Sequence, residues 1–246
     1  MQESTASHAR HRSSGVNRRT VATGMAWAIP VAVAATPTPA FAASTCVGSP
    51  NVCASGTMGF GGAVDGNGWQ KNVTGAFSPS TVFQYKNPYT AANVASCSGD
   101  GCTAVSPGNT TSVANAIYIE SNPTGSGRVA TYFKTMCLSA GTTYTFTFSW
   151  AAYTANCRAA YLDSAILNPD GTIAAAGAQV VAPASTKGNT SGTVTITITP
   201  LTTSDAYTFR YTWTFGTTPT SYGGSCNIGA NDIGVSAPTV TCRAAA

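Results

Sequence analysis

Carboxylates are the side chains of this chain that could carry out acid–base chemistry. The chain has eight acidic residues, and Glu3 is the one that precedes residue 43. Glycosidases need two carboxylates on either side of a sugar-binding cleft, yet Glu120 is the single glutamate after residue 42. Asp170 lies in a turn sequence and Asp205 precedes a predicted strand, where aspartate commonly caps a turn. A glycoside hydrolase is therefore only the third functional hypothesis; the other acids are Asp65, Asp100, Asp163 and Asp232.

Histidine and thiol chemistry are excluded by composition. His8 and His11 are the two histidines, and both belong to the leader segment described below. Without them a Ser-His-Asp triad, a histidine base and a histidine-ligated zinc ion are impossible. The eight cysteines all follow the leader, and none has the Cys-x-x-Cys spacing of zinc sites. An even number of cysteines behind an export signal predicts four disulfides, so we expect no catalytic residue and no enzyme.

The first 42 residues have the pattern of a cleavable export signal. A polar stretch that ends in Arg18-Arg19 precedes an apolar run over residues 21–35, and Ala40 and Ala42 are the small residues of a cleavage site. A membrane-spanning helix would need about 20 apolar residues, more than this run contains. We expect cleavage between Ala42 and Ala43 and export by either the general or the twin-arginine pathway. The product would be a secreted protein without a membrane anchor. The leader resembles those of exported actinobacterial proteins.

The charge of the mature chain gives no sign of a nucleic-acid partner. The leader holds four of the 12 basic residues and one of the eight acidic residues, which leaves eight basic and seven acidic residues. A net charge of about +1 does not provide the basic surface that nucleic acid or an anionic membrane requires.

We expect a monomer.

Alternation of apolar and polar residues dominates residues 43–246. Thr143–Trp150, Gly192–Thr199 and Ala206–Phe215 each place aromatic or branched residues on one face and threonines on the other. This period of two is typical of half-buried antiparallel strands. Weaker candidate strands are Thr81–Tyr85, Asn115–Glu120, Arg128–Leu138, Ala160–Leu167, Thr172–Val181 and Asn231–Ser236, with a hairpin turn over residues 168–171.

These strands predict an all-β fold. We expect a single two-layer, antiparallel, jelly-roll-like sandwich over residues 43–246, stapled by disulfides, with an irregular N-terminal region over residues 43–80 and no substantial helix after the leader.

Two segments resemble parts of a known fold family. Residues 136–146, Met-Cys-Leu-Ser-Ala-Gly-Thr-Thr-Tyr-Thr-Phe, look like the strand–turn–strand of carbohydrate-binding, galactose-binding-like jelly rolls, and residues 231–235 look like their last strand. The resemblance implies a secreted, non-catalytic module for a glycan or cell-surface ligand. It also implies a structural calcium ion held by Asn231 and Asp232, although Asn231 stands where that family usually has an acid. The alternative is a structural or interaction protein of the cell envelope.

Aromatic side chains on the outer faces of strands are the candidate ligand-binding residues. Tyr118 alternates with Ile117 and Ile119, so Tyr118 and the adjacent Glu120 are candidate ligand contacts. Tyr132 is a further candidate, because it faces solvent if Phe133 faces the core. Met136 and Leu138 favour the opposite register, and a bulge in the strand would reconcile the two registers. The threonine faces are typical of solvent-exposed sheets, with an ordered-water surface of the ice-binding kind as the alternative.

Strand direction predicts the disulfide pairs. If Thr143–Trp150 and Ala206–Phe215 run in the same direction, Cys157 and Cys226 lie at one end of the sandwich, and Cys137 and Cys242 at the other. We therefore expect Cys157–Cys226 and Cys137–Cys242, with Cys46–Cys53 and Cys97–Cys102 as local pairs. A link from Cys46 to Cys242 would be the alternative.

Overall fold

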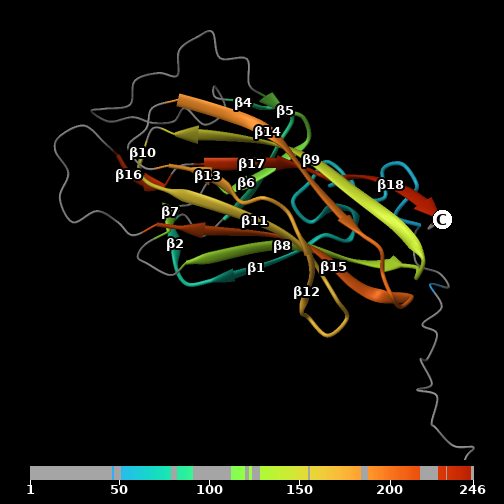
Figure 1. Cartoon of the computed structure of the whole chain (residues 1–246). Coiled ribbons are helices and arrows are strands. Elements are labelled where there is room, and N and C mark those ends of the chain that lie inside the picture. Colours follow the sequence, from blue (N-terminus) through green and yellow to red (C-terminus); the bar gives the residue numbers. More distant parts are fainter. Residues whose placement is uncertain are drawn as a thin grey trace, which may run out of the picture. The chain divides into compact units, whose positions relative to one another are not determined.

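The protein is a two-layer antiparallel β-sandwich in a computed structural model (Figure 1). The structure describes residue 46 and residues 51–78, 82–90, 112–119, 122–123, 128–154, 156–183, 188–216, 227–230 and 232–244, all within one compact unit, Ala43–Ala246. In these ranges the helical content is one 3-10 turn, η1 (Gly66–Gly68). The predicted fold class, all-β and disulfide-stapled, is confirmed.

The first sheet has the strand order β1-β8-β15-β11-β12. Strand β15 occupies its centre, and β13 pairs with β11 beyond the end of β12. The strands are β1 (Gln70–Thr74), β8 (Val129–Leu138), β11 (Ala160–Leu167), β12 (Ile173–Ala176), β13 (Val180–Ala182) and β15 (Ser204–Phe215).

The second sheet has the order β14-β9-β17-β6-β3, and β18 pairs with β9. Its strands are β3 (Phe83–Lys86), β6 (Ala116–Ile119), β9 (Thr142–Thr154), β14 (Gly188–Ile198), β17 (Asp232–Ser236) and β18 (Thr239–Ala244). Three short pairs complete the described strands: β2 (Phe77–Ser78) with β7 (Asn122–Pro123), β4 (Tyr89–Thr90) with β5 (Ser112–Val113), and β10 (Asn156–Arg158) with β16 (Asn227–Ala230), the last parallel.

The predicted hairpin at residues 168–171 is confirmed. The backbone N–H of Asn168 donates to Thr172 O at 2.8 Å, and Gly171 has a φ of 84°, which favours glycine. The side chain of Asp170 accepts a hydrogen bond from Thr172 N at 2.9 Å, so this acid belongs to the turn as expected. The segment predicted as one strand, Thr172–Val181, instead forms β12 and β13. Between them a Cβ on Gly177 would lie 2.5 Å from Ser164 Oγ, so the chain passes too close to its neighbours for a larger residue.

Strand β15 connects the two sheets through the polar ends of buried aromatic residues. The Tyr211 hydroxyl donates to Ser236 O at 2.9 Å, and Trp213 Nε1 donates to Ile233 O at 3.0 Å. Both acceptors lie on β17 of the second sheet, and both aromatic side chains are fully buried. Buried polar groups need such partners, so these two bonds fix which residues of β15 face the core.

The N-terminal segment closes one end of the sandwich. The Trp69 ring stacks on Tyr132 of β8 with centroids 4.9 Å apart. Asn67 adopts a left-handed backbone with φ 54°, and its side-chain amide donates to three backbone carbonyls of residues 56–59. The Lys134 ammonium donates to Thr57 O and Asn67 O at 2.6 and 2.5 Å. The region expected to be irregular to residue 80 therefore folds specifically over residues 51–69 and becomes strand β1 at Gln70.

The observed disulfides differ from two of the predicted pairs. Cys46 is bonded to Cys137, with Cα atoms 5.7 Å apart, and Cys53 is bonded to Cys242, with Cα atoms 5.9 Å apart. The predictions Cys46–Cys53 and Cys137–Cys242 were wrong. The strand directions behind them are confirmed, because β15 is antiparallel to β8 and β17 is antiparallel to β9.

The error lies in which face each cysteine occupies. Cys137 alternates with the core residues Met136 and Leu138 and so faces away from the core of the first sheet, whereas Cys242 pairs with buried Tyr144 in the second sheet. Packed sheets lie about 10 Å apart, and the N-terminal segment reaches both cysteines. Cys97, Cys102 and Cys226 lie outside the described residues, as does the side chain of Cys157. β10, which contains Cys157, pairs with β16, which begins directly after Cys226.

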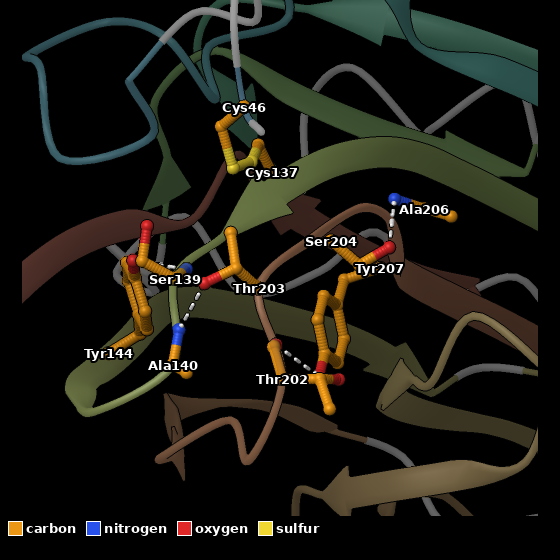
Figure 2. The surroundings of a disulfide bond; sticks show 10 residues. All are labelled: Cys46, Cys137, Ser139, Ala140, Tyr144, Thr202, Thr203, Ser204, Ala206 and Tyr207. Atoms are coloured by element: carbon orange, nitrogen blue, oxygen red, sulfur yellow. Dashed lines mark hydrogen bonds between the residues drawn. A yellow bond between two sulfur atoms is a disulfide. The ribbon is translucent and has the colours of Figure 1, made fainter. Parts of the chain in front are cut away.

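The motif that carried the family resemblance forms a turn beside the first disulfide (Figure 2). After β8 the backbone N–H of Ser139 donates to the Tyr144 hydroxyl, and that of Ala140 donates to Thr203 Oγ1, each at 2.9 Å. Gly141 has a φ of 70°. These residues therefore shape the connection from β8 to β9, which is a structural role.

Disulfide connectivity is the first testable prediction. We expect non-reducing peptide mapping to recover Cys46–Cys137 and Cys53–Cys242. Each closes a loop of 91 or 189 residues, so replacing either pair by serine should lower the free energy of unfolding by about 2–5 kcal/mol in urea titrations. A peptide that links Cys137 to Cys242 would contradict the fold described here.

Alkaline unfolding is the second prediction. Burial raises the pKa of Tyr89, Tyr132 and Tyr211, and raises that of Tyr153 to about 12. A raised phenol pKa stabilises the fold fully below pH 10, and this contribution is lost as pH rises through the folded pKa, by up to about 1.4 kcal/mol per pH unit for each group. Burial lowers the pKa of Lys134 from 10.5. Between the folded pKa and 10.5 this group therefore makes stability rise with pH, opposite to the tyrosines.

We therefore expect the urea midpoint, followed by circular dichroism, to fall steeply between pH 10 and 12. Phenolate absorbance of the buried tyrosines should appear together with unfolding. Full ionisation near pH 10 with the secondary structure intact would contradict the burial of these hydroxyls.

Candidate functional site

The two tyrosines predicted to bind a ligand are buried. Tyr132 is 0% exposed and its hydroxyl donates to Val64 O, because β8 pairs with β15 without a register shift from Val129 to Met136. Tyr118 does face away from Ile117, but strand β4 covers it: the Tyr89 ring lies 4.7 Å from the Tyr118 ring. Neither tyrosine offers a surface to a ligand, and this corrects the prediction. Glu120 and Asn231 lie outside the described residues.

Successive side chains of β8 point to opposite faces, so Phe133 lies on the outer face of the first sheet whereas Tyr132 is buried. Phe133 lies directly opposite Arg210 of β15, and Arg210 lies opposite Ala165 of β11. One row along, Thr212 of β15 lies opposite Asp163 of β11. We call this outer surface the Arg210 face; its members are Gln70, Asn72, Thr74, Val129, Thr131, Phe133, Thr135, Tyr161, Asp163, Ala165, Leu167, Thr208, Arg210, Thr212 and Thr214.

Arg210 is at the centre of this face and has no partner among the residues that the structure describes. It takes part in no hydrogen bond or ion pair with the described residues, and its Nε atom is buried and unsatisfied. The two terminal nitrogens are not among the buried unsatisfied atoms, so they reach solvent. A buried guanidinium nitrogen without an acceptor costs free energy, and the sheet holds Arg210 there because its neighbours on β15, Phe209 and Tyr211, are fixed in the core.

Asp163 is the charged acceptor of this face, and its side chain is exposed. Its Oδ1 accepts a hydrogen bond from Gln179 Nε2 at 2.9 Å. Gln179 precedes β13, whose pairing with β11 places Val181 opposite Tyr161. Asp163 is diagonal to Arg210 across the β11–β15 pair, a separation of about 7–8 Å. An exposed carboxylate and a guanidinium therefore lie close together without pairing.

Two half-buried rings border these charges. Phe133 adjoins Arg210 on one side, and Tyr161 lies two residues from Asp163 along β11. Neither ring belongs to the core cluster. A surface that offers aromatic faces, donors, an acceptor and threonine hydroxyls can bind a flat amphipathic ligand through stacking and hydrogen bonds.

The outer face of the second sheet is chemically different. Threonines of β9 and β14 form hydroxyl pairs, Thr143 with Thr199 at 2.8 Å and Thr145 with Thr197 at 3.3 Å. β18 adds Thr239 and Thr241 in register. This threonine face also includes Thr147, Thr193 and Thr195. It carries hydroxyls and methyls but no ring, and Arg243 of β18, opposite Thr143, adds one charge at its end.

Other parts of the described chain offer little chemistry. No group of three or more acidic, histidine or cysteine residues converges on a metal-sized site within those residues. Asp163 and Asp232 lie on opposite outer faces of the sandwich, so they do not form a glycosidase pair. A pocket of about 300 Å³ between residues 52–59 and 237–240 is lined by small and apolar residues. Among the described residues no helix is long and apolar enough to span a membrane.

Sequence reasoning missed the Arg210 face for a clear reason. Phe133, Asp163 and Arg210 lie on three strands that are far apart in sequence, and only the sheet order brings them together. A usable signal was present: Arg210 is the one charged residue among the outward threonines of the strand predicted over Ala206–Phe215.

Comparisons with known proteins find similar solved structures but no matching family model or curated protein. Three similar solved structures are a family 61 carbohydrate-binding module with β-1,4-galactotriose (TM-score 0.40, 9% identity, 79% of this chain and 100% of that one), a family 4 module (0.36, 15%, 70% and 86%), and the tailspike protein 4 of bacteriophage CBA120 (0.38, 13%, 78% and 21%). The chain thus spans about a fifth of the tailspike chain. These identities and TM-scores are too low to carry an argument about function.

Proposed function

We propose that this chain is a secreted, non-catalytic module that binds a glycan on the Arg210 face. The observation that carries the proposal is one solvent-facing surface that combines an exposed carboxylate, two half-buried rings (Phe133 and Tyr161) and a guanidinium without a partner among the described residues.

The chemistry of this face suits a sugar ring. A pyranose has an apolar face of C–H groups, which packs on an aromatic ring, and a rim of hydroxyls that both donate and accept. Phe133 and Tyr161 supply the rings, while Arg210 donates and Asp163 accepts through charge-assisted hydrogen bonds. No other outer face in the described residues combines these groups.

The face is also rigid. Arg210 and Phe133 lie on adjacent strands whose opposite faces contribute fully buried aromatic residues to the core. Side chains held by a packed sheet lose little conformational entropy when a ligand binds. A ligand would therefore meet a preformed surface.

Secretion rests on the leader and on the cysteines. Disulfides persist in oxidising compartments, and the structure pairs four of the eight cysteines across long loops. Together with the export signal of the first 42 residues, this supports a protein that acts outside the cytoplasm.

The test of this proposal is a polysaccharide panel on the oxidised mature chain, read by affinity electrophoresis and titration calorimetry. Phe133→Ala and Tyr161→Ala should each weaken binding of the polysaccharides that bind by about tenfold, as loss of an aromatic anchor costs about 1–2 kcal/mol. Leu201→Ala, which truncates a side chain that is 95% exposed in the turn before β15, is the matched control. All variants should keep the wild-type melting temperature within a few degrees.

Two results would contradict the proposal: no binding to any polysaccharide of the panel, or binding that Phe133→Ala and Tyr161→Ala leave at the wild-type level.

The threonine face supports a second candidate, a cell-envelope interaction protein without a small ligand. In that case Thr145→Lys should abolish sedimentation with purified cell-wall material, because a charged side chain disrupts a flat hydroxyl surface, and Phe133→Ala should not.

A structural calcium ion at Asn231 and Asp232 stays a proposal. Asp232 lies on the outer face of β17 opposite Tyr153, and its charge adds to the effect of burial in raising the pKa of Tyr89. A metal bound only to the folded state raises the melting temperature, so a chelator should lower it. Identical melting curves with chelator and with millimolar calcium would contradict the proposed calcium site.

A further inference from the structure

The charges of the Arg210 face are unevenly satisfied. Register places two charged residues there, Arg210 and Asp163. Asp163 accepts a hydrogen bond from Gln179 at the sheet edge, whereas Arg210 has no acceptor within the described part of the chain. Elsewhere Lys71 forms an ion pair with Asp65 at 2.8 Å, and Lys134 is bonded to two backbone carbonyls. Arg210 thus lies at the centre of the surface without a hydrogen-bonded acceptor among the described residues, and Asp163 is the negative charge diagonal to it.

The exposed end of Arg210 determines what it can bind. Because Nε is covered and both terminal nitrogens reach solvent, a ligand must approach the fork formed by the two terminal nitrogens. A planar carboxylate fits that fork with two parallel hydrogen bonds, and such charge-assisted bidentate pairs are stronger than hydrogen bonds between neutral groups. A neutral hydroxyl would use one nitrogen and leave the charge uncompensated.

Small residues and one ring flank Arg210 in its row. Toward the sheet edge the neighbours are Ala165, which is buried, and then Ala176, which is exposed. The neighbour on the other side is the half-buried Phe133 ring. A sugar whose carboxylate meets Arg210 can thus pack against the exposed part of the Phe133 ring.

We propose that the ligand is an acidic glycan, and that Arg210 binds the carboxylate of a uronic acid unit. This inference rests on the proposed function, because it names the class of glycan bound by the same face. Asp163 then accepts from a hydroxyl of the ligand through the oxygen that Gln179 does not occupy.

The experiment compares polygalacturonate, alginate and hyaluronan with the carboxyl-reduced form of each polymer. Wild-type protein should bind at least one native polymer at least tenfold more tightly than its reduced form, since hydrogen bonds to charged groups are the stronger ones. Raising the salt concentration should reduce this preference. Arg210→Gln should remove the preference, and Arg210→Lys should restore only part of it. Arg243→Gln removes the same charge from the exposed edge strand β18 and should keep the preference.

The outcomes separate this inference from the proposed function. Binding of neutral polysaccharides that Phe133→Ala weakens and Arg210→Gln does not would overturn the acidic ligand and leave the glycan-binding face intact. Equal binding of native and reduced polymers would overturn it as well. Absence of binding to every polymer, acidic or neutral, would overturn both.

Discussion

Two hydrogen bonds across the sandwich fix the central strand, and the surface of the molecule follows from them. Tyr211 and Trp213 of β15 donate to backbone carbonyls of Ser236 and Ile233 in the opposite sheet. Side chains alternate along a strand, so a shift of one residue would turn all of these groups to solvent. With β15 held in this register, Arg210 must point outward, although its Nε has no partner there. The buried aromatic residues on one side of β15 thus determine which residues its other side exposes.

The N-terminal segment adds a second constraint that acts on both sheets. Its disulfides join β8 of the first sheet and β18 of the second, and the Trp69 ring stacks on Tyr132 and Tyr211 of the first sheet. The buried Lys134 ammonium is satisfied by carbonyls of the same segment. The segment thus becomes part of the core, to which Val52, Met58, Phe60 and Trp69 belong.

The sequence predicted those parts of the fold that depend on local pattern. Strong alternation located β9, β14 and β15, and the turn chemistry of Asp170 and Gly171 located a hairpin. The prediction did not extend to properties set by sheet order. The faces of Cys137 and Tyr132 depend on which side of β8 meets the other sheet, and the residues that could bind a ligand become neighbours only when β8, β15 and β11 pair. Short strands such as β1 carry too little pattern to be recognised.

The central claim is that ligand recognition takes place on the outer face of the first sheet, centred on Arg210. Backbone amide shifts during titration of isotope-labelled mature protein with oligosaccharides of the acidic and neutral polymers test it most directly. The account predicts saturable shifts at Phe133, Tyr161, Asp163 and Arg210, with the amides of β14 unchanged. Shifts confined to the threonines of β9 and β14, or no shift with any oligosaccharide, would contradict it.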